Sequence, residues 1–130
     1  QGEQVALLAV GTMVGQAMKA AQALANDGID VTVVNCRYLK PYDAITLQAI
    51  LARHSHVVTI EEGTVVNGFG AFMSATIQRL APSVRVTVLG VPDRIIYAAP
   101  RSKQLAACGL DPVSIADRVR GLRSSEVLAG

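Results

Sequence analysis

Four nearly continuous apolar runs, rich in β-branched residues, divide the chain. They span Val5–Val10, Val31–Cys36, His56–Ile60 and Val84–Leu89. Strands that are covered on both faces have this pattern, because neither side of the strand meets water. The runs therefore predict parallel strands inside a sheet. The short apolar segment Ile95-Ile96-Tyr97 indicates one further strand, an antiparallel one at the edge.

Helical patterns separate these runs. Residues 14–26 carry apolar side chains on one stripe and stop at Gly28, and Asp43 is placed to cap the next helix. Further helices are predicted over residues 70–80, over 102–108 and from Asp111-Pro112 onward. Alternating strands and helices predict a three-layer αβα sandwich with a mostly parallel open sheet, for which we take the strand order 2-1-3-4. We expect one domain over residues 1–123 and a flexible tail over 124–130.

The composition is poor in charge. Only 17% of the residues are charged, against about 25% in a typical soluble domain, which indicates that other domains or a second subunit cover part of the surface. The net charge of +2 is small and the basic residues are scattered, which argues against nucleic-acid binding. We also expect no membrane span, because no apolar run approaches about 18 residues, and a cytoplasmic location.

The cysteines and histidines show no metal-site spacing. Cys36 and Cys108 stand alone, and no Cys-x-x-Cys motif occurs, so we interpret them as reduced, partly buried apolar residues. His54 and His56 have no acidic or cysteine partner at ligand spacing. The sequence therefore predicts no metal ligands and no catalytic residues.

Two loops are expected at the carboxyl edge of the sheet, where the strand order reverses and ligands bind in open α/β sheets. The first, residues 11–15, contains Thr12 between two glycines. Those glycines either permit a tight strand-to-helix turn or expose backbone N–H groups to an anion, and we favour the turn. The second, residues 61–68, contains Glu61, Glu62 and Asn67.

Acidic residues in these loops leave alternatives open. Either one of Glu61 and Glu62 acts as a base or hydrogen-bond acceptor at the strand tip, or they anchor the loop. As an anchor they would accept hydrogen bonds from backbone N–H groups or pair with Arg37 or Arg94, and we favour this interpretation. In the third loop, Asp93 and Arg94 follow a proline. They either form an ion pair that fixes the loop or present Arg94 to a partner.

Four motifs in order resemble the C-terminal domain of the transketolase superfamily, most closely that of 1-deoxy-D-xylulose-5-phosphate synthases. They are Arg37-Tyr38-Leu39-Lys40-Pro41-Tyr42-Asp43, Glu61-Glu62 with Asn67-Gly68-Phe69-Gly70, Gly90-Val91-Pro92-Asp93 and Gly109-Leu110-Asp111. The resemblance covers nearly the whole chain. At residues 97–100 the sequence is closer to transketolase than to the synthases, which leaves the substrate open.

The resemblance implies a docking and dimer-supporting domain of a thiamine-diphosphate enzyme. Such an enzyme binds thiamine diphosphate and Mg²⁺ in upstream domains, through a motif that begins Gly-Asp-Gly, and this chain contains no Gly-Asp dipeptide. We therefore expect no cofactor on this chain and no activity from it alone. The expected partners are the upstream domains and a second subunit of a homodimer.

Six residues are the expected interface or active-site-entrance positions: Thr12, Glu61, Glu62, Asn67, Asp93 and Arg94. The full enzyme would join pyruvate to glyceraldehyde 3-phosphate or act as a transketolase. Two alternatives remain, namely the C-terminal domain of a 2-oxoacid dehydrogenase β-subunit and a free-standing small-molecule-binding or interaction module.

Overall fold

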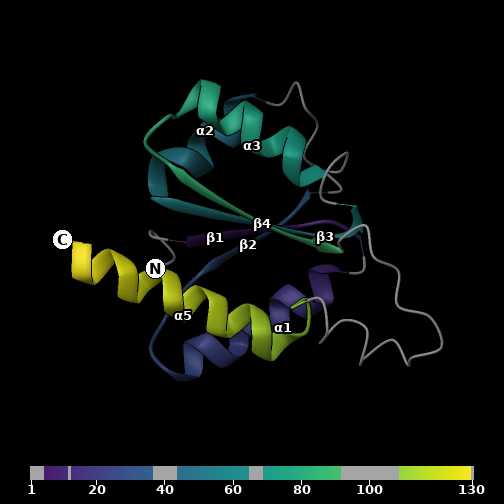
Figure 1. Ribbon diagram of the computed structural model, residues 1–130, viewed down its shortest axis with the longest axis vertical. Coiled ribbons are helices and arrows are strands. Elements are labelled where there is room, and N and C mark those ends of the chain that lie inside the picture. Colours follow the sequence, from purple (N-terminus) through teal and green to yellow (C-terminus); the bar gives the residue numbers. More distant parts are fainter. Residues whose placement is uncertain (1–4, 12, 37–43, 65–68, 92–108, 130) are drawn as a thin grey trace.

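Eight helices and strands make up the part of the chain that the computed structural model describes, residues 5–11, 13–36, 44–64, 69–91 and 109–129 (Figure 1). In chain order they are β1 (Val5–Ala9), α1 (Met13–Asn26), β2 (Thr32–Asn35), α2 (Ala44–Arg53), β3 (His56–Thr64), α3 (Phe69–Leu80), β4 (Arg85–Val91) and α5 (Pro112–Ala129). The described strands form one sheet of order β2-β1-β3-β4 with every neighbouring pair parallel. The predicted sheet and its strand order are confirmed.

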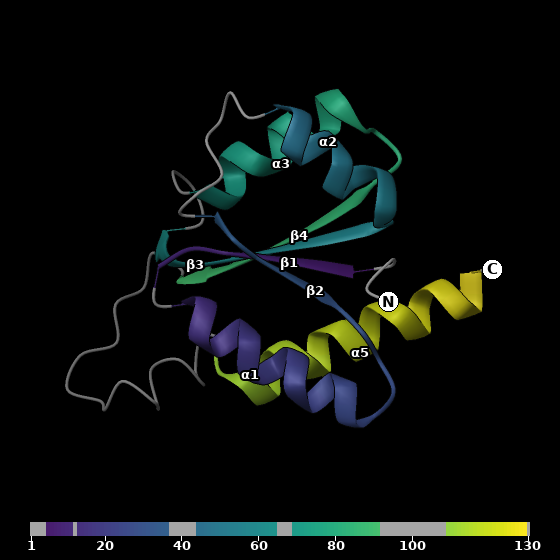
Figure 2. The ribbon, with the colours of Figure 1, turned by 180° about the vertical axis from the view of Figure 1, so that it is seen from behind.

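The sheet lies between two helical layers, with α1 and α5 on one face and α2 and α3 on the other (Figures 1 and 2). Alternate residues of β1 supply both cores. Val5, Leu7 and Ala9 pack with α1 and α5, whereas Ala6 and Leu8 pack with α2 and α3. All five are at most 1% exposed, which explains why the strand is apolar at every position.

The end of α1 follows from Gly28. This residue has a φ of 77°, a left-handed conformation that glycine adopts without steric cost. The Ile29 N–H donates to the Leu24 carbonyl at 2.8 Å, and the Gly28 N–H donates to the Ala25 carbonyl at 2.9 Å. These two bonds are those of a Schellman motif. They end the helix and place Ile29 against the core that Leu24 also joins.

Two boundaries differ from the prediction. β3 continues beyond Ile60 to Thr64, with a register shift against β4 between Ile60 and Thr64. The last helix, α5, continues through Ala129 and so extends into the segment 124–130, for which a flexible tail stays a prediction. No proline or glycine interrupts residues 122–129, so nothing in that stretch ends the helix.

Three further predictions lie outside the described residues: the edge strand at residues 95–97, the helix at 102–108 and the cap at Asp43. Within the described ranges, no helix is long and apolar enough to cross a membrane.

Candidate functional site

The carboxyl ends of β1 and β3 meet where the strand order reverses. Ala9 pairs with Ile60, and the Val10 N–H donates to the Ile60 carbonyl at 3.1 Å. The chain leaves β1 toward α1 on one face and β3 toward α3 on the other. A crevice at this point is the usual ligand position in open α/β sheets.

Only one of the six candidate positions has a described side chain. Thr12, Asn67, Asp93 and Arg94 lie outside the described residues, and so does the side chain of Glu62. Their expected role at an interface or active-site entrance therefore stays a prediction. Glu61 is the candidate that the structure places.

The Glu61 carboxylate anchors the start of α3. The side chain is 7% exposed, and its Oε1 accepts a hydrogen bond from the Gly70 N–H at 2.8 Å. Gly70 is the second residue of α3, where backbone N–H groups have no partner inside the helix and the helix dipole favours an anion. This contact agrees with the interpretation of Glu61 as an anchor rather than a base. It engages Oε1 in a hydrogen bond that stabilises the fold.

The first turn of α3 lies directly on the sheet. A Cβ added at Gly70 would stand 2.4 Å from Val88 Cγ1 and 2.8 Å from Thr59 Oγ1. Thr59 is fully buried, and its Oγ1 has no hydrogen-bond partner among the described residues. Only glycine permits this approach, so Gly70 and Glu61 together fix both ends of the segment between β3 and α3.

The loop after β1 shows the geometry of a turn. Gly11 has a φ of 61°, and the Met13 N–H donates to the Val10 carbonyl at 3.1 Å. Gly15 lies inside α1 and is exposed, with open space where a Cβ would be. These observations favour the turn over an anion site.

The two histidines lie at the amino edge of the sheet, opposite to the edge with Glu61. His54 is 6% exposed; its Nδ1 lies 2.6 Å from the Ile50 carbonyl oxygen, and its Nε2 lies 2.9 Å from Thr32 Oγ1. His56 Nε2 lies 2.9 Å from Thr87 Oγ1. The histidines thus tie α2 to β2 and β3 to β4. Among the described residues, no three His, Cys, Asp or Glu side chains come close enough to share a metal ion.

Cys36 is a buried thiol. It is 7% exposed, and burial raises its pKa from the ordinary 9.0 to about 12. A nucleophilic cysteine needs the opposite change, because the thiolate is the reactive form. The interpretation of Cys36 as a reduced, apolar core residue agrees with this environment.

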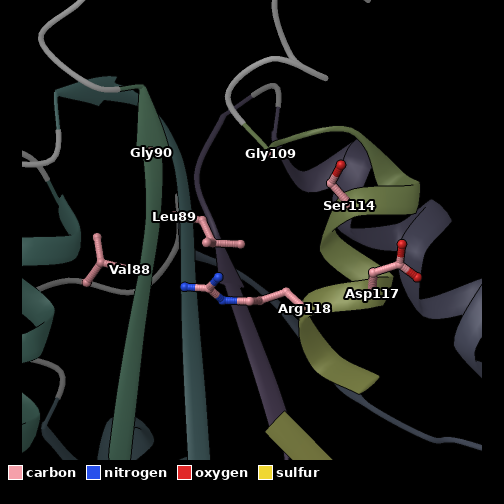
Figure 3. Close-up of a pocket in the computed structure, with 7 residues that line it drawn as sticks. All are labelled: Val88, Leu89, Gly90, Gly109, Ser114, Asp117 and Arg118. Atoms are coloured by element: carbon pink, nitrogen blue, oxygen red, sulfur yellow. The ribbon is translucent and has the colours of Figure 1, made fainter. Parts of the chain in front are cut away.

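A groove of about 610 Å³ that the sequence did not indicate lies between the end of β4 and the first turns of α5. In Figure 3, Leu89 and Arg118 point toward each other across this groove, and Val88 points to the other side of the sheet. Ser114, Asp117 and Arg118 line the groove from α5. Asp117 and Arg118 follow Ser114 by three and four positions, which places all three on one side of the helix. This spacing is the only indication of the groove that the sequence contains. Exposed Arg118 is the only cation among the described lining residues, and this is too little to define a ligand.

Arg120 makes two ion pairs at the surface. Its guanidinium donates to Asp117 at 2.8 Å and to Asp27, which follows α1, at 2.5 Å. The hydrogen bond to Asp27, followed by the one to Asp117, raises the pKa of Arg120. This arginine is neutralised within the chain.

Comparison with known proteins gives one consistent result. The family model described as "Transketolase, C-terminal domain" matches residues 1–115. The 1-deoxy-D-xylulose-5-phosphate synthase of Burkholderia pseudomallei (strain 668) is 43% identical over 122 residues, covering 92% of this chain and 18% of the synthase. The synthase of Acaryochloris marina is 38% identical over 121 residues, covering 93% of this chain and 19% of that protein.

Among solved structures, a split-gene transketolase described as an inactive β4 tetramer superposes with a TM-score of 0.82 and 30% identity. The match covers 93% of this chain and 39% of that one. The chain thus spans less than a fifth of the two synthases and well under half of the transketolase chain.

Proposed function

The chain belongs to the transketolase C-terminal domain family, and from this premise we propose that it is the docking and dimer-supporting domain of a thiamine-diphosphate-dependent transferase. The observation that carries the proposal is the uneven coverage of the match. About nine-tenths of this chain aligns with less than a fifth of each synthase. The low charge content supports it, because a docking domain needs surface that partners cover.

The described residues do not fit the cofactor of such an enzyme. The buried Glu61 carboxylate holds the Gly70 N–H, and no cluster of described side chains suits a divalent cation. A diphosphate with Mg²⁺ needs carboxylate oxygens that are free to bind the metal. We therefore assign the binding of thiamine diphosphate and Mg²⁺ to upstream domains of a longer protein and derive no catalytic step for this chain.

The similarity favours the synthase reaction, in which pyruvate is decarboxylated and joined to glyceraldehyde 3-phosphate. The two synthases are 38% and 43% identical to this chain, against 30% for the transketolase. We also propose a homodimer, in which Thr12, Glu62, Asn67, Asp93 and Arg94 lie toward other domains while the buried Glu61 anchors α3, and a cytoplasmic location. The free, buried thiol of Cys36 supports a reducing compartment.

The size of the native polypeptide tests this function. An antibody raised against residues 1–130 should detect, in the source cells, a band several times larger than 13.6 kDa. The purified 130-residue chain, given thiamine diphosphate, Mg²⁺, pyruvate and glyceraldehyde 3-phosphate, should show no turnover. A native band at 13.6 kDa, or measurable turnover by the isolated chain, would contradict the proposal.

A further inference from the structure

One aspartate of the chain precedes a glycine. It is Asp27, directly after α1, and Gly28 follows it. An aspartate in this position can close a five-membered ring with the main chain, because glycine has no side chain that hinders its nitrogen and its backbone turns more freely than that of other residues. Every other aspartate in the sequence precedes a residue with a side chain.

The reaction rearranges the main chain. The Gly28 nitrogen attacks Cγ of the Asp27 carboxyl group; a C–N bond forms, the nitrogen loses its proton, and one carboxyl oxygen leaves as water. Water then opens the resulting succinimide ring at one of its two carbonyl carbons. If the bond between the nitrogen and the former main-chain carbonyl breaks, Cγ stays bonded to Gly28, and the product is isoaspartate with a free α-carboxylate.

The structure exposes the dipeptide to water but restrains its carboxyl group. The Asp27 side chain is 54% exposed, and Gly28 is exposed as well. Arg120 donates a hydrogen bond to Asp27 Oδ2 at 2.5 Å and another to Asp117, on its own helix, at 2.8 Å. A carboxylate paired with a guanidinium is a poor electrophile, because an oxygen leaves easily only from the protonated group.

The attacking nitrogen is restrained too. The Gly28 N–H donates to the Ala25 carbonyl at 2.9 Å, and the Asp27 N–H donates to the Leu24 carbonyl at 3.0 Å. The nitrogen must give up its proton and approach Cγ, so this turn has to open before the ring can close. Both restraints lie where the end of α1 meets α5, which run side by side on one face of the sheet (Figure 2).

We propose that Asp27-Gly28 is a site of spontaneous isoaspartate formation, and that Arg120 slows the reaction while α5 stays packed against α1. An exposed ion pair is weak, so Arg120 slows ring closure without abolishing it. The rate of isoaspartate formation at Asp27 consequently measures how well this contact between the two helices is kept.

The product would disturb the contact that had protected it. Isoaspartate adds one methylene group to the main chain ahead of Gly28, inside the turn that the hydrogen bond from the Ile29 N–H to the Leu24 carbonyl closes at 2.8 Å. Its carboxylate is attached directly to Cα and no longer reaches Arg120 as the aspartate does. That α-carboxylate is the group on which an isoaspartate-specific carboxyl methyltransferase acts, and this chemistry defines the kind of enzyme that would recognise the altered chain.

Peptide mapping after several weeks at physiological temperature and neutral pH tests the proposal on the 130-residue chain. Trypsin cleaves after Lys19 and Arg37, so Asp27 lies in the peptide of residues 20–37 and Asn67-Gly68, a second possible source of isoaspartate, lies in another. Methyl transfer from S-adenosylmethionine quantifies isoaspartate, and electron-transfer fragmentation locates it. Isoaspartate should form at Asp27 faster in urea than in the folded chain, and Arg120→Ala should accelerate its formation in the folded chain by about two- to fivefold.

Two controls separate the ion pair from other effects. Arg118→Ala removes an exposed arginine of the same helix and should leave the rate at Asp27 unchanged. Asp27→Asn closes the same ring with loss of ammonia, but its amide forms no ion pair. Adding Arg120→Ala to Asp27→Asn should therefore not change the rate, and circular dichroism should show every variant folded.

Absence of isoaspartate at Asp27 even in the urea-unfolded chain would overturn the proposed site. Equal rates in the wild type and Arg120→Ala, or in Arg118→Ala and Arg120→Ala, would overturn the role of Arg120. So would an acceleration by Arg120→Ala that persists beside Asp27→Asn, because it would act through the turn and not through the ion pair. The size of the native polypeptide, which tests the proposed function, is independent of all these outcomes.

Discussion

At the scale of single residues, the contact between β3 and α3 depends on two side-chain choices. Glu61 supplies a buried acceptor for the Gly70 N–H, and Gly70 has no side chain to collide with Val88 and Thr59. Either residue alone is ordinary in a sequence. Their pairing allows the first turn of a helix to lie directly on a sheet, which fixes where the following segment of chain begins.

Replacing Gly70 by alanine should destabilise the chain by about 1–3 kcal/mol, because the new methyl group would stand 2.4 Å from Val88 Cγ1. Urea denaturation measures the change. Gly15→Ala is the matched control: its Cβ meets nothing within 4 Å, and alanine in an exposed helix should stabilise by roughly 0.5–1 kcal/mol. Equal changes in the free energy of unfolding for the two substitutions would contradict the close approach of α3 to the sheet.

Cys36 predicts how stability depends on alkaline pH. The unfolded thiol ionises at its ordinary pKa of 9.0, whereas the buried one keeps its proton to a pKa of about 12. Between these values the unfolded state binds fewer protons, so rising pH favours unfolding. The contribution of Cys36 is fully present below pH 9.0 and is lost as the pH rises toward about 12.

Denaturation curves of the wild type and Cys36→Ala across this pH range isolate the effect, since the other titrating groups are common to both proteins. The wild type should lose stability with pH more steeply than the variant. Parallel curves would mean that the thiol is not buried as described.

At the scale of elements, α5 completes the core on one face of the sheet. Ile115 and Val119 are fully buried against β1, β3 and α1, although the helix as a whole is polar. Its start follows the sequence: the Ile115 N–H donates to the Asp111 carbonyl at 3.0 Å, and Pro112 is the first helical residue. Packing, more than amphipathic pattern, holds this helix on the sheet.

Ile115→Ala should therefore cost about 2–5 kcal/mol of folding free energy through the cavity it leaves. Val113→Ala, two residues earlier and 66% exposed, should change stability by no more than about 0.5 kcal/mol. Thermal and urea unfolding measure both. Similar losses for the two variants would contradict the described orientation of α5.

At the scale of the whole molecule, the two helical layers differ in charge more than in architecture. The layer of α1 and α5 includes the ion pairs of Arg120 with Asp27 and Asp117, which suit a surface in water. The layer of α2 and α3 has only an arginine at the end of each helix. This asymmetry leaves one outer layer with several charges and one almost without charge, in agreement with the proposed docking role.

The sequence by itself determined the strands, the helices between them and the parallel sheet that they form. Continuous apolar strands such as Val5–Ala9 are covered on both faces, and Gly28 ends a helix because it comes where the apolar stripe of residues 14–26 stops. These are properties of short segments, so the pattern of residues is sufficient. Motifs spread over nearly the whole chain likewise identified the family, because each keeps its own local spacing.

Only the tertiary structure decided what the polar residues do. The sequence left Glu61 as base or anchor, and the choice depends on where the Gly70 N–H lies, nine residues away and across a segment of chain. His54 bonds Thr32, 22 positions away, and the groove beside Arg118 joins β4 to α5. The exposed residues of α2 and α3 likewise formed one surface only when both helices packed on the same face of the sheet. Such contacts depend on distances between segments that no local pattern encodes.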